Sequence, residues 1–155
     1  MAIDKKDREI LQLLQANASL SLAEVASAVN LTQTPCWRRI QKLQADGVIQ
    51  KQVALCDAKK LNVGLTTFVT IRTSQHNEQW MERFVAGATS IPEIVEIYRL
   101  SGNSDYLLKI VVPDISRYDT VYKRLIRTVD LLDVSSAFVM ETIKCTTALP
   151  LDYAE

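Results

Sequence analysis

Two short helices separated by a tight turn are the pattern that most restricts the fold of this chain. Ser21 and Glu24 have the S-x-x-E spacing of a capping box, in which the serine accepts from an amide three residues on and the glutamate bonds back. The spacing predicts a helix over 22–29. Thr32 is expected to cap a further helix, which Gly47 would end because glycine readily adopts positive φ. Two such helices joined by a short turn indicate a helix-turn-helix.

The segments on either side extend this unit. Asp4 is placed to cap a preceding helix, with Asp7 in its first turn, where the helix dipole favours negative charge. Residues 48–57 are rich in β-forming side chains and predict a wing hairpin or an outgoing strand. We therefore expect a winged helix-turn-helix over 1–50, followed by a wing exit and linker over 51–63.

The helix before Gly47 has two chemically distinct sides. Cys36, Ile40 and Leu43 form an apolar stripe at helical spacing, which predicts that this side is core and that Cys36 is a packed thiol. The outer side is polar and basic, without a carboxylate before Asp46. Arginine and glutamine pair with guanine and adenine edges, lysine binds phosphate, and helix-start amides bind anions. The candidate DNA-binding residues are therefore Gln33, Thr34, Arg38, Arg39, Gln41 and Lys42.

Charge distribution permits this function without requiring it. Residues 1–63 carry nine basic and six acidic side chains, a net charge of +3, whereas the whole chain of 155 residues is neutral. The alternative is an ordinary solvated helix, which would be favoured for an isolated basic helix. The capped helix and tight turn before it favour nucleic-acid binding.

The remainder of the chain alternates strand and helix patterns. The expected strands are 65–73, 93–102, 105–114 and 133–145, and the expected helices are 77–91 and 117–130. The order β-α-β-β-α-β predicts a ferredoxin-like domain over 64–155, so the fold class is α+β. Two helices on one sheet face leave the other face bare, and we expect a second subunit to cover it.

Composition excludes several other classes. The charged N-terminus resembles no signal peptide, and no apolar run is long enough to span a membrane, so a soluble cytoplasmic protein without membrane partners is expected. Cys36, Cys56 and Cys145 are widely spaced and predict neither a metal site nor a disulfide framework. His76, the single histidine, lies in a polar loop and is interpreted as solvated, so no catalytic set is expected.

Three segments of the chain resemble the corresponding segments of a known family. LTQTPCWRRIQKLQADGVI over 31–49 resembles the recognition helix and wing entry of the Lrp/AsnC regulators. LSGNSDYLLKIVVPDISRYDTVYKRLI over 100–126 resembles their effector-binding domain of the RAM type. SSAFVMETIKCTTALPL over 135–151 is similar to their last strand and tail, so the resemblance covers essentially the whole chain.

The resemblance implies a sequence-specific transcriptional regulator. It implies a homodimer on double-stranded DNA, nucleoid-associated in the cytoplasm, with dimers assembling to an octamer or larger ring. It also implies a small effector, commonly an amino acid, bound between effector domains, and no other cofactor. Trp37 replaces the smaller aliphatic residue of many members. Asn103 replaces the acidic residue that many members carry after the glycine, so the effector's identity does not transfer.

The candidate effector site is the polar turn after the second strand of this domain. Gly102 allows close backbone approach, and the short polar side chains that follow can hold the charged ends of an amino acid. The alternative for the turn is a plain solvated β-turn. The candidate effector-binding residues are Gly102, Asn103, Ser104 and Asp105, with the hydroxyls of Ser135 and Ser136 from the last strand.

Two other functions remain open from the sequence. Sirohaem decarboxylases resemble the same two-part architecture, so a sirohaem-decarboxylase-like enzyme is the main alternative. Such enzymes are expected to use histidine and arginine in a tetrapyrrole pocket, and the single loop histidine disfavours that function. The other alternative is an effector-binding subunit that has lost DNA contact, which the carboxylate-free outer helix side disfavours.

Overall fold

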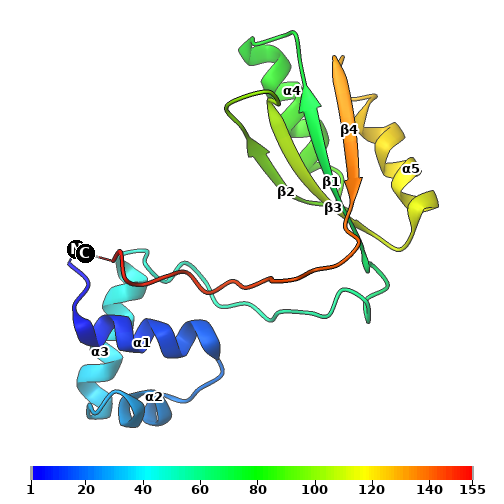
Figure 1. Ribbon diagram of the computed structural model, residues 1–155. Coiled ribbons are helices and arrows are strands. Elements are labelled where there is room, and N and C mark those ends of the chain that lie inside the picture. Colours follow the sequence, from blue (N-terminus) through cyan, green and yellow to red (C-terminus); the bar gives the residue numbers. More distant parts are fainter. Residues whose placement is uncertain (1, 155) are drawn as a thin grey trace. The chain divides into compact units, whose positions relative to one another are not determined.

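The computed structural model describes residues 2–154, which form two compact units. The first unit contains the chain up to Leu55 together with the segment from Lys144 onward, and the second unit is Cys56–Ile143. Figure 1 shows three helices in the first unit and a sheet with two helices in the second. The elements in chain order are α1 (Lys5–Ala16), α2 (Leu22–Ala28), α3 (Gln33–Ala45), β1 (Leu65–Arg72), α4 (Glu78–Thr89), β2 (Ile94–Arg99), β3 (Tyr106–Val112), α5 (Ile115–Leu125) and β4 (Asp133–Phe138).

The helix starts of the first unit follow the expected capping chemistry. Asp4 and Asp7 form a capping box at α1, and Ser21 and Glu24 form one at α2, so both predicted caps are confirmed. Thr32 occupies the N-cap position of α3, but its side chain makes no capping hydrogen bond. Gly47 follows α3 with φ +73°, which confirms the expected helix end.

The core of the first unit holds α3 against the other two helices. Ile10 and Leu11 of α1, Val25 of α2, and Cys36 and Leu43 of α3 are buried in one hydrophobic cluster. The predicted apolar stripe of α3 is thus confirmed at Cys36 and Leu43, and Ile40 packs against the same cluster while partly exposed. The opposite side of α3 is left at the surface.

The wing segment and the tail differ from the sequence expectation. Residues 48–57 form no strand in the part of the chain that the structure describes, so the predicted wing hairpin is not formed. The last residues belong to the first unit, although they were expected within a 64–155 domain. Gln15 binds both backbone groups of Leu149, donating to its carbonyl at 3.2 Å and accepting from its amide at 2.6 Å. Leu151 packs against the helical core, so tertiary packing places this segment.

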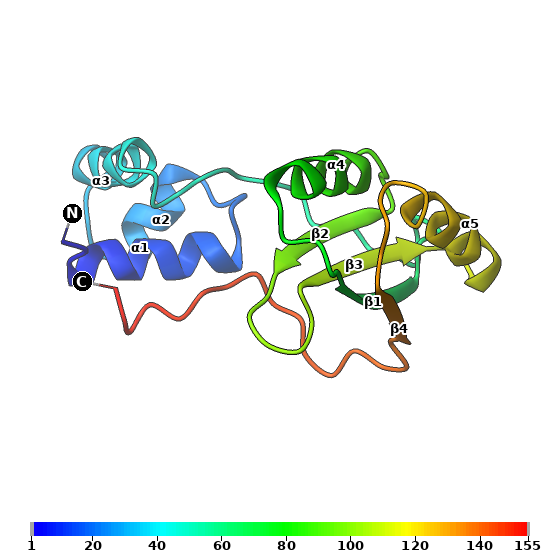
Figure 2. The same ribbon diagram turned by 90° about the horizontal axis from the view of Figure 1, so that it is seen from above.

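The second unit is a four-stranded antiparallel sheet in the order β2-β3-β1-β4. Figure 2 shows α4 and α5 on one side of that sheet. Both helices bury aromatic or aliphatic side chains against the strands, with Trp80 and Phe84 from α4 and Val121 and Leu125 from α5 in one core. This arrangement confirms the ferredoxin-like βαββαβ fold.

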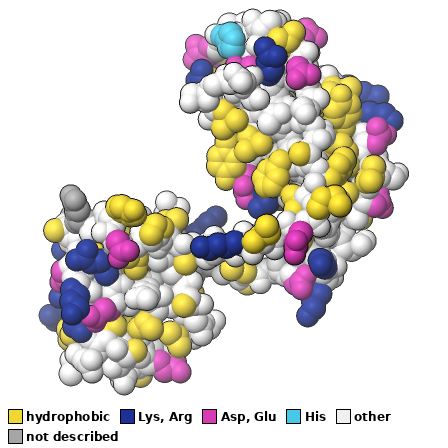
Figure 3. Space-filling model, viewed as in Figure 1, with side chains coloured by type: hydrophobic (Ala, Val, Ile, Leu, Met, Phe, Trp, Pro, Cys, Tyr) yellow, Lys and Arg dark blue, Asp and Glu magenta, His cyan; other side chains and the backbone are white. Residues whose placement is uncertain are grey.

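The other face of the sheet carries no helix of this unit. Phe68 on β1 lies at the centre of this face, opposite Lys109 on β3 and Ala137 on β4. Figure 3 shows hydrophobic side chains gathered over the strands on this face. Tyr98 from β2 is also half exposed, so the face combines apolar surface with a few polar groups. We call this surface the open sheet face.

No helix of the described residues is long and apolar enough to cross a membrane.

Candidate functional sites

The outer side of α3 is the candidate nucleic-acid interface. Thr34, Arg38, Gln41 and Lys42 are all exposed there, and Gln33 is exposed at the helix start. The buried side chains of Cys36 and Leu43 orient the helix so that these polar groups face outward. The structure therefore brings five of the six predicted DNA-binding residues to one exposed side or end of a helix.

The N-terminus of α3 adds the amides of Gln33 and Thr34, which no side chain of the described residues caps, whereas Pro35 has no amide to offer. Thr32 makes no side-chain hydrogen bond to the helix start, although its carbonyl accepts from the Cys36 amide at 3.2 Å. The first amides of a helix point along its axis and bind anions. This start is therefore suited to a phosphate group.

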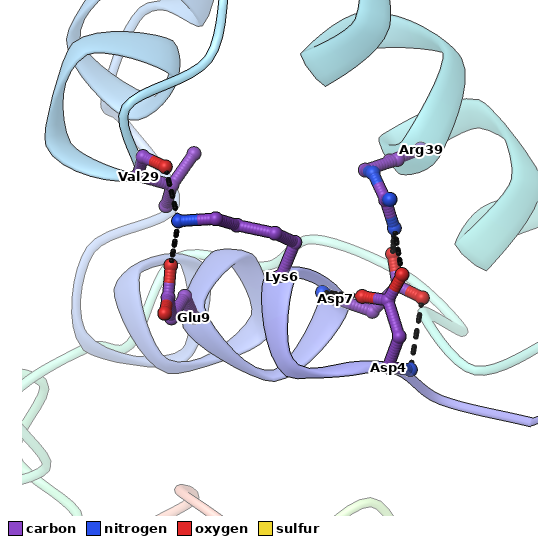
Figure 4. Close-up of polar contacts among 6 residues, drawn as sticks. All are labelled: Asp4, Lys6, Asp7, Glu9, Val29 and Arg39. Carbon is purple, nitrogen blue, oxygen red and sulfur yellow. Dashed lines mark hydrogen bonds and ion pairs between the residues drawn. The ribbon is translucent and has the colours of Figure 1, made fainter.

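Arg39 does not share that outer surface. Its Nη1 donates to Asp4 Oδ2 at 2.6 Å and to Asp7 Oδ1 at 2.8 Å, so the guanidinium is turned toward α1 (Figure 4). The sequence placed Arg39 among the candidate DNA-binding residues because helical spacing describes only the residue's own helix. The structure instead commits this side chain to an ion pair within the unit.

Cys36 is a structural thiol in this unit. Its side chain is fully buried, and burial raises the pKa of the thiol above its usual value, only partly opposed by nearby Arg39. A buried thiol with a raised pKa is a poor nucleophile. The interpretation of Cys36 as core is therefore confirmed.

The candidate effector turn joins β2 to β3. Gly102 has φ +124°, a backbone conformation that favours glycine, and its position has open space around it. Asp105 closes the turn through three bonds of 2.8 Å: its amide donates to the Ile71 carbonyl, its carbonyl accepts from Leu100, and its carboxylate Oδ2 accepts from the Thr73 amide. The turn is thus fixed to the end of β1.

Two shallow pockets lie beside this turn. One, of about 290 Å³, is lined by Arg99, Leu100 and residues at the start of α4, and the other, of about 480 Å³, by Arg72, Thr73 and Gly102. His76 and Asp105 line both pockets. Cationic and anionic side chains therefore meet at one end of the sheet, as a ligand with both charges requires.

Sequence reasoning missed His76, Arg72 and Arg99 at this site. His76 is exposed in a loop, as predicted, and antiparallel pairing of β1 with β3 brings that loop next to Asp105. The strand order could have revealed this, because the end of β1 must lie beside the start of β3 in this fold. Asn103 lines one pocket as expected, whereas Ser104 lines neither.

Ser135 and Ser136 are not brought to the turn by this chain. Successive residues of a strand point to opposite faces, so the two hydroxyls cannot both line one site on the sheet. Ser136 hydrogen bonds with the Tyr118 hydroxyl on the helix-covered face, and Ser135 is exposed opposite Thr70. Neither serine lines either pocket. This differs from the expectation that they complete the Gly102–Asp105 site.

Within the described residues, no group of three or more histidine, cysteine and carboxylate side chains is placed to hold a metal ion.

Comparisons with known proteins match both units. The winged helix-turn-helix DNA-binding family matches residues 3–50, and the Lrp/AsnC ligand binding domain family matches residues 66–149. The DNA-binding transcriptional activator DecR of Escherichia coli is 48% identical over 97% of this chain and 99% of its own length. The glutamate uptake regulatory protein of Zymomonas mobilis is 46% identical over 96% of this chain and 91% of its own.

Solved structures agree with these relatives. An AsnC family transcriptional regulator from Agrobacterium tumefaciens is 54% identical and superposes with a TM-score of 0.93, covering 97% of this chain and 98% of its own. A Neisseria meningitidis transcriptional regulator in complex with L-Met is 33% identical, with a TM-score of 0.92 over the same shares of the two chains. The helix-turn-helix, the ferredoxin-like unit and these matches lead to one conclusion: the chain belongs to the Lrp/AsnC family of transcriptional regulators.

Proposed function

We propose that this regulator binds DNA sequence-specifically through α3 and responds to a small amino acid bound near the Gly102–Asp105 turn. The observation that carries the DNA part is the outer side of α3. It exposes arginine, glutamine and lysine without a carboxylate, on a helix held by a capped helix-turn-helix. Such a helix fits the major groove, where these side chains read base edges.

Each residue of this surface has a proposed role. Arg38 lies centrally on the outer side and reads bases, with Gln41 next to it. Lys42 lies toward the end of α3 and binds phosphate as a point charge. Gln33 and Thr34 present the uncapped helix start to a phosphate of the same groove. These assignments separate sequence recognition from electrostatic attraction.

The effector part rests on the charges around the turn. Asp105 Oδ2 is occupied by the Thr73 amide, whereas Oδ1 accepts no hydrogen bond from the described residues and is available to an ammonium group. Arg99 lines one pocket, Arg72 the other and His76 both, and these side chains suit a carboxylate. The ligand binding family that matches this unit and the L-Met complex of the Neisseria regulator support an amino acid as the ligand.

Self-association is part of the proposal. The open sheet face exposes Phe68 and Tyr98 in an antiparallel sheet whose other face is covered by helices. A second copy of this chain on that face would bury them, and a two-fold dimer would place two α3 helices on successive turns of DNA. Dimers are proposed to assemble further to an octamer or larger ring.

The regulator is favoured over the sirohaem-decarboxylase-like enzyme. The relatives named above are described as a transcriptional activator, a regulatory protein and transcriptional regulators, and the two units of this chain match families of DNA binding and ligand binding. We therefore assign no catalytic residue.

Two measurements test the proposal together. Selection of duplexes from a random-sequence pool by the full chain should yield an imperfect palindrome. A thermal-shift screen of the twenty amino acids should raise the melting temperature for a small subset, and these should alter affinity for the selected duplex. Failure to enrich any sequence would contradict specific DNA binding. Absence of a shift with every amino acid would contradict the effector class.

A further inference from the structure

The first turn of α1 contacts α3 through ion pairs with Arg39. The guanidinium leaves the flank of α3 toward Asp4 and Asp7, as Figure 4 shows. The Asp7 side chain is only 12% exposed and the Arg39 side chain 34% exposed, so this pair lies partly inside the unit. Partial burial strengthens an ion pair relative to one fully in solvent.

Both carboxylates are held on two sides. Asp4 Oδ1 accepts from the Asp7 amide at 2.8 Å, and Asp7 Oδ2 accepts from the Asp4 amide at 3.2 Å. The remaining oxygen of each carboxylate accepts a hydrogen bond from Arg39. The capping box that starts α1 therefore also orients the two carboxylate oxygens that bind Arg39 of α3. One local motif thus serves two helices.

The charges agree with this geometry. The Asp7 amide, and then Arg39, lower the pKa of Asp4 below its ordinary value, so the carboxylate stays ionised. The hydrogen bonds that Arg39 donates to Asp7 and, second, to Asp4 raise the pKa of Arg39. Asp4 and Arg39 thus each favour the charged form of the other.

The same turn of α1 also holds the other helix of the motif. Lys6 Nζ donates to the Val29 carbonyl at the end of α2 at 2.7 Å and pairs with Glu9 at 2.7 Å. Figure 4 shows that Lys6 extends to Val29 at the end of α2. It also shows that Asp4 and Asp7, from the same turn of α1, face Arg39 of α3. The start of α1 thus contacts both helices of the helix-turn-helix through charged groups.

We infer that Arg39 is a positioning residue for DNA recognition, which holds α3 against α1 through Asp4 and Asp7 so that Arg38 and Lys42 meet the duplex in register. Arg39 then contributes to binding without contacting phosphate. The inference rests on the proposed role of α3 in DNA binding. It assigns a recognition role to two acidic residues, which a purely electrostatic view of DNA binding would count as unfavourable.

The two possible roles of Arg39 predict opposite signs for carboxylate removal. If Arg39 bound phosphate, Asp7→Asn would remove one of the two carboxylates that compete for the guanidinium, and with it a negative charge near DNA, and would strengthen binding. If Arg39 positions α3, Asp7→Asn loosens the helix and weakens binding. Asparagine can still accept the capping hydrogen bonds of α1, so the substitution changes the ion pair while leaving the cap in place.

The experiment measures affinity of the full-length chain for a duplex that the wild type selects from a random pool, as a function of KCl concentration. We expect Asp7→Asn to weaken binding roughly tenfold and Asp4→Asn, at the more exposed carboxylate, roughly threefold, with the salt dependence of both unchanged. Arg39→Met should weaken DNA binding as much as Asp7→Asn does. The double variant Asp7→Asn/Arg39→Met should bind DNA no more weakly than Arg39→Met alone. Circular dichroism at the assay temperature checks that each variant is folded.

A matched control separates the ion pair from general charge effects. Lys123→Met removes a more exposed ion pair, with Asp119 within α5 of the other unit, and should leave affinity unchanged. Stronger binding by Asp7→Asn, or a salt slope shallower by about one in Arg39→Met, would overturn the inference and make Arg39 a phosphate contact. If the wild type selects no duplex, the proposed function itself fails, which is a different result from either variant outcome.

Discussion

The proposed DNA-reading helix α3 and the candidate effector turn differ in how completely one chain builds them. Around α3, Arg39 is paired with two carboxylates that the capping box of α1 orients. Around the turn, Asp105 uses one carboxylate oxygen internally, and the pockets beside it are shallow and lined by exposed charges such as Arg72 and Arg99. We therefore expect the proposed DNA-reading surface to be preorganised within one copy of the chain, and the candidate effector site to need a neighbouring copy to enclose its ligand.

The largest expected effect concerns that neighbouring copy. Phe68→Asp places a charge at the centre of the open sheet face, where an opposing subunit would desolvate it. We expect dimerisation to weaken at least about 100-fold, because each copy loses a buried aromatic side chain and gains a buried charge. Sedimentation of the full chain at micromolar concentration measures it. As a control, Ile115→Asp makes a matched apolar-to-charged change at an exposed position of α5 and should leave the assembly intact.

Next in size is the loss of base recognition at α3. Arg38→Ala should weaken binding to the selected duplex by about 1–3 kcal/mol and relax specificity, because a bidentate base contact is lost. Lys42→Ala should instead weaken all duplexes similarly and shallow the salt slope by about one. Affinity measured on selected and scrambled duplexes separates the two. An equal loss of specificity in both variants would show that the roles are wrongly assigned.

The effector turn should respond to a change of charge alone. Asp105→Asn preserves an acceptor for the Thr73 amide and removes the charge offered to an ammonium group. We expect effector affinity to fall about 10- to 100-fold with DNA affinity of the unliganded protein unchanged. Calorimetry with an amino acid from the thermal-shift screen measures it.

Gly102→Val sharpens the same test by a different mechanism. A Cβ at Gly102 meets nothing within 4 Å, so valine would act through strain at φ +124° and by intruding on a ligand, not by a clash within the chain. If Asp105→Asn and Gly102→Val both bind the effector with wild-type affinity, the effector binds elsewhere.

The smallest expected effect is the pH dependence of stability at the start of α1. The pKa of Asp4 is lowered in the folded chain, so its contribution is present above its ordinary value of 3.8 and is lost as pH falls through the lower folded value. The Asp4 side chain is 52% exposed, and solvent screening limits the contribution to less than about 1 kcal/mol. Urea unfolding of the wild type and Asp4→Asn should differ at neutral pH and converge in acid. A difference that grows in acid would contradict the sign.

Local sequence determined most elements of this protein, although not the wing over 48–57, where no strand forms. The capping boxes at Asp4 and Ser21, the positive φ at Gly47 and the strand-helix order after residue 64 were all predictable, because each depends on residues a few positions apart. The outer side of α3 was predictable for the same reason, since helical spacing alone places its residues on one side.

Only the tertiary structure decided which side chains meet. Arg39 pairs with carboxylates more than thirty residues away, strand pairing places His76 and Asp105 around the same pockets, and the C-terminal segment joins the first unit through contacts to Gln15 of α1. Ser136 turns instead to Tyr118, because neighbouring strand residues face opposite sides. Helix and strand periods specify faces from local spacing, whereas the partner of each face depends on how distant elements pack, which no local pattern contains.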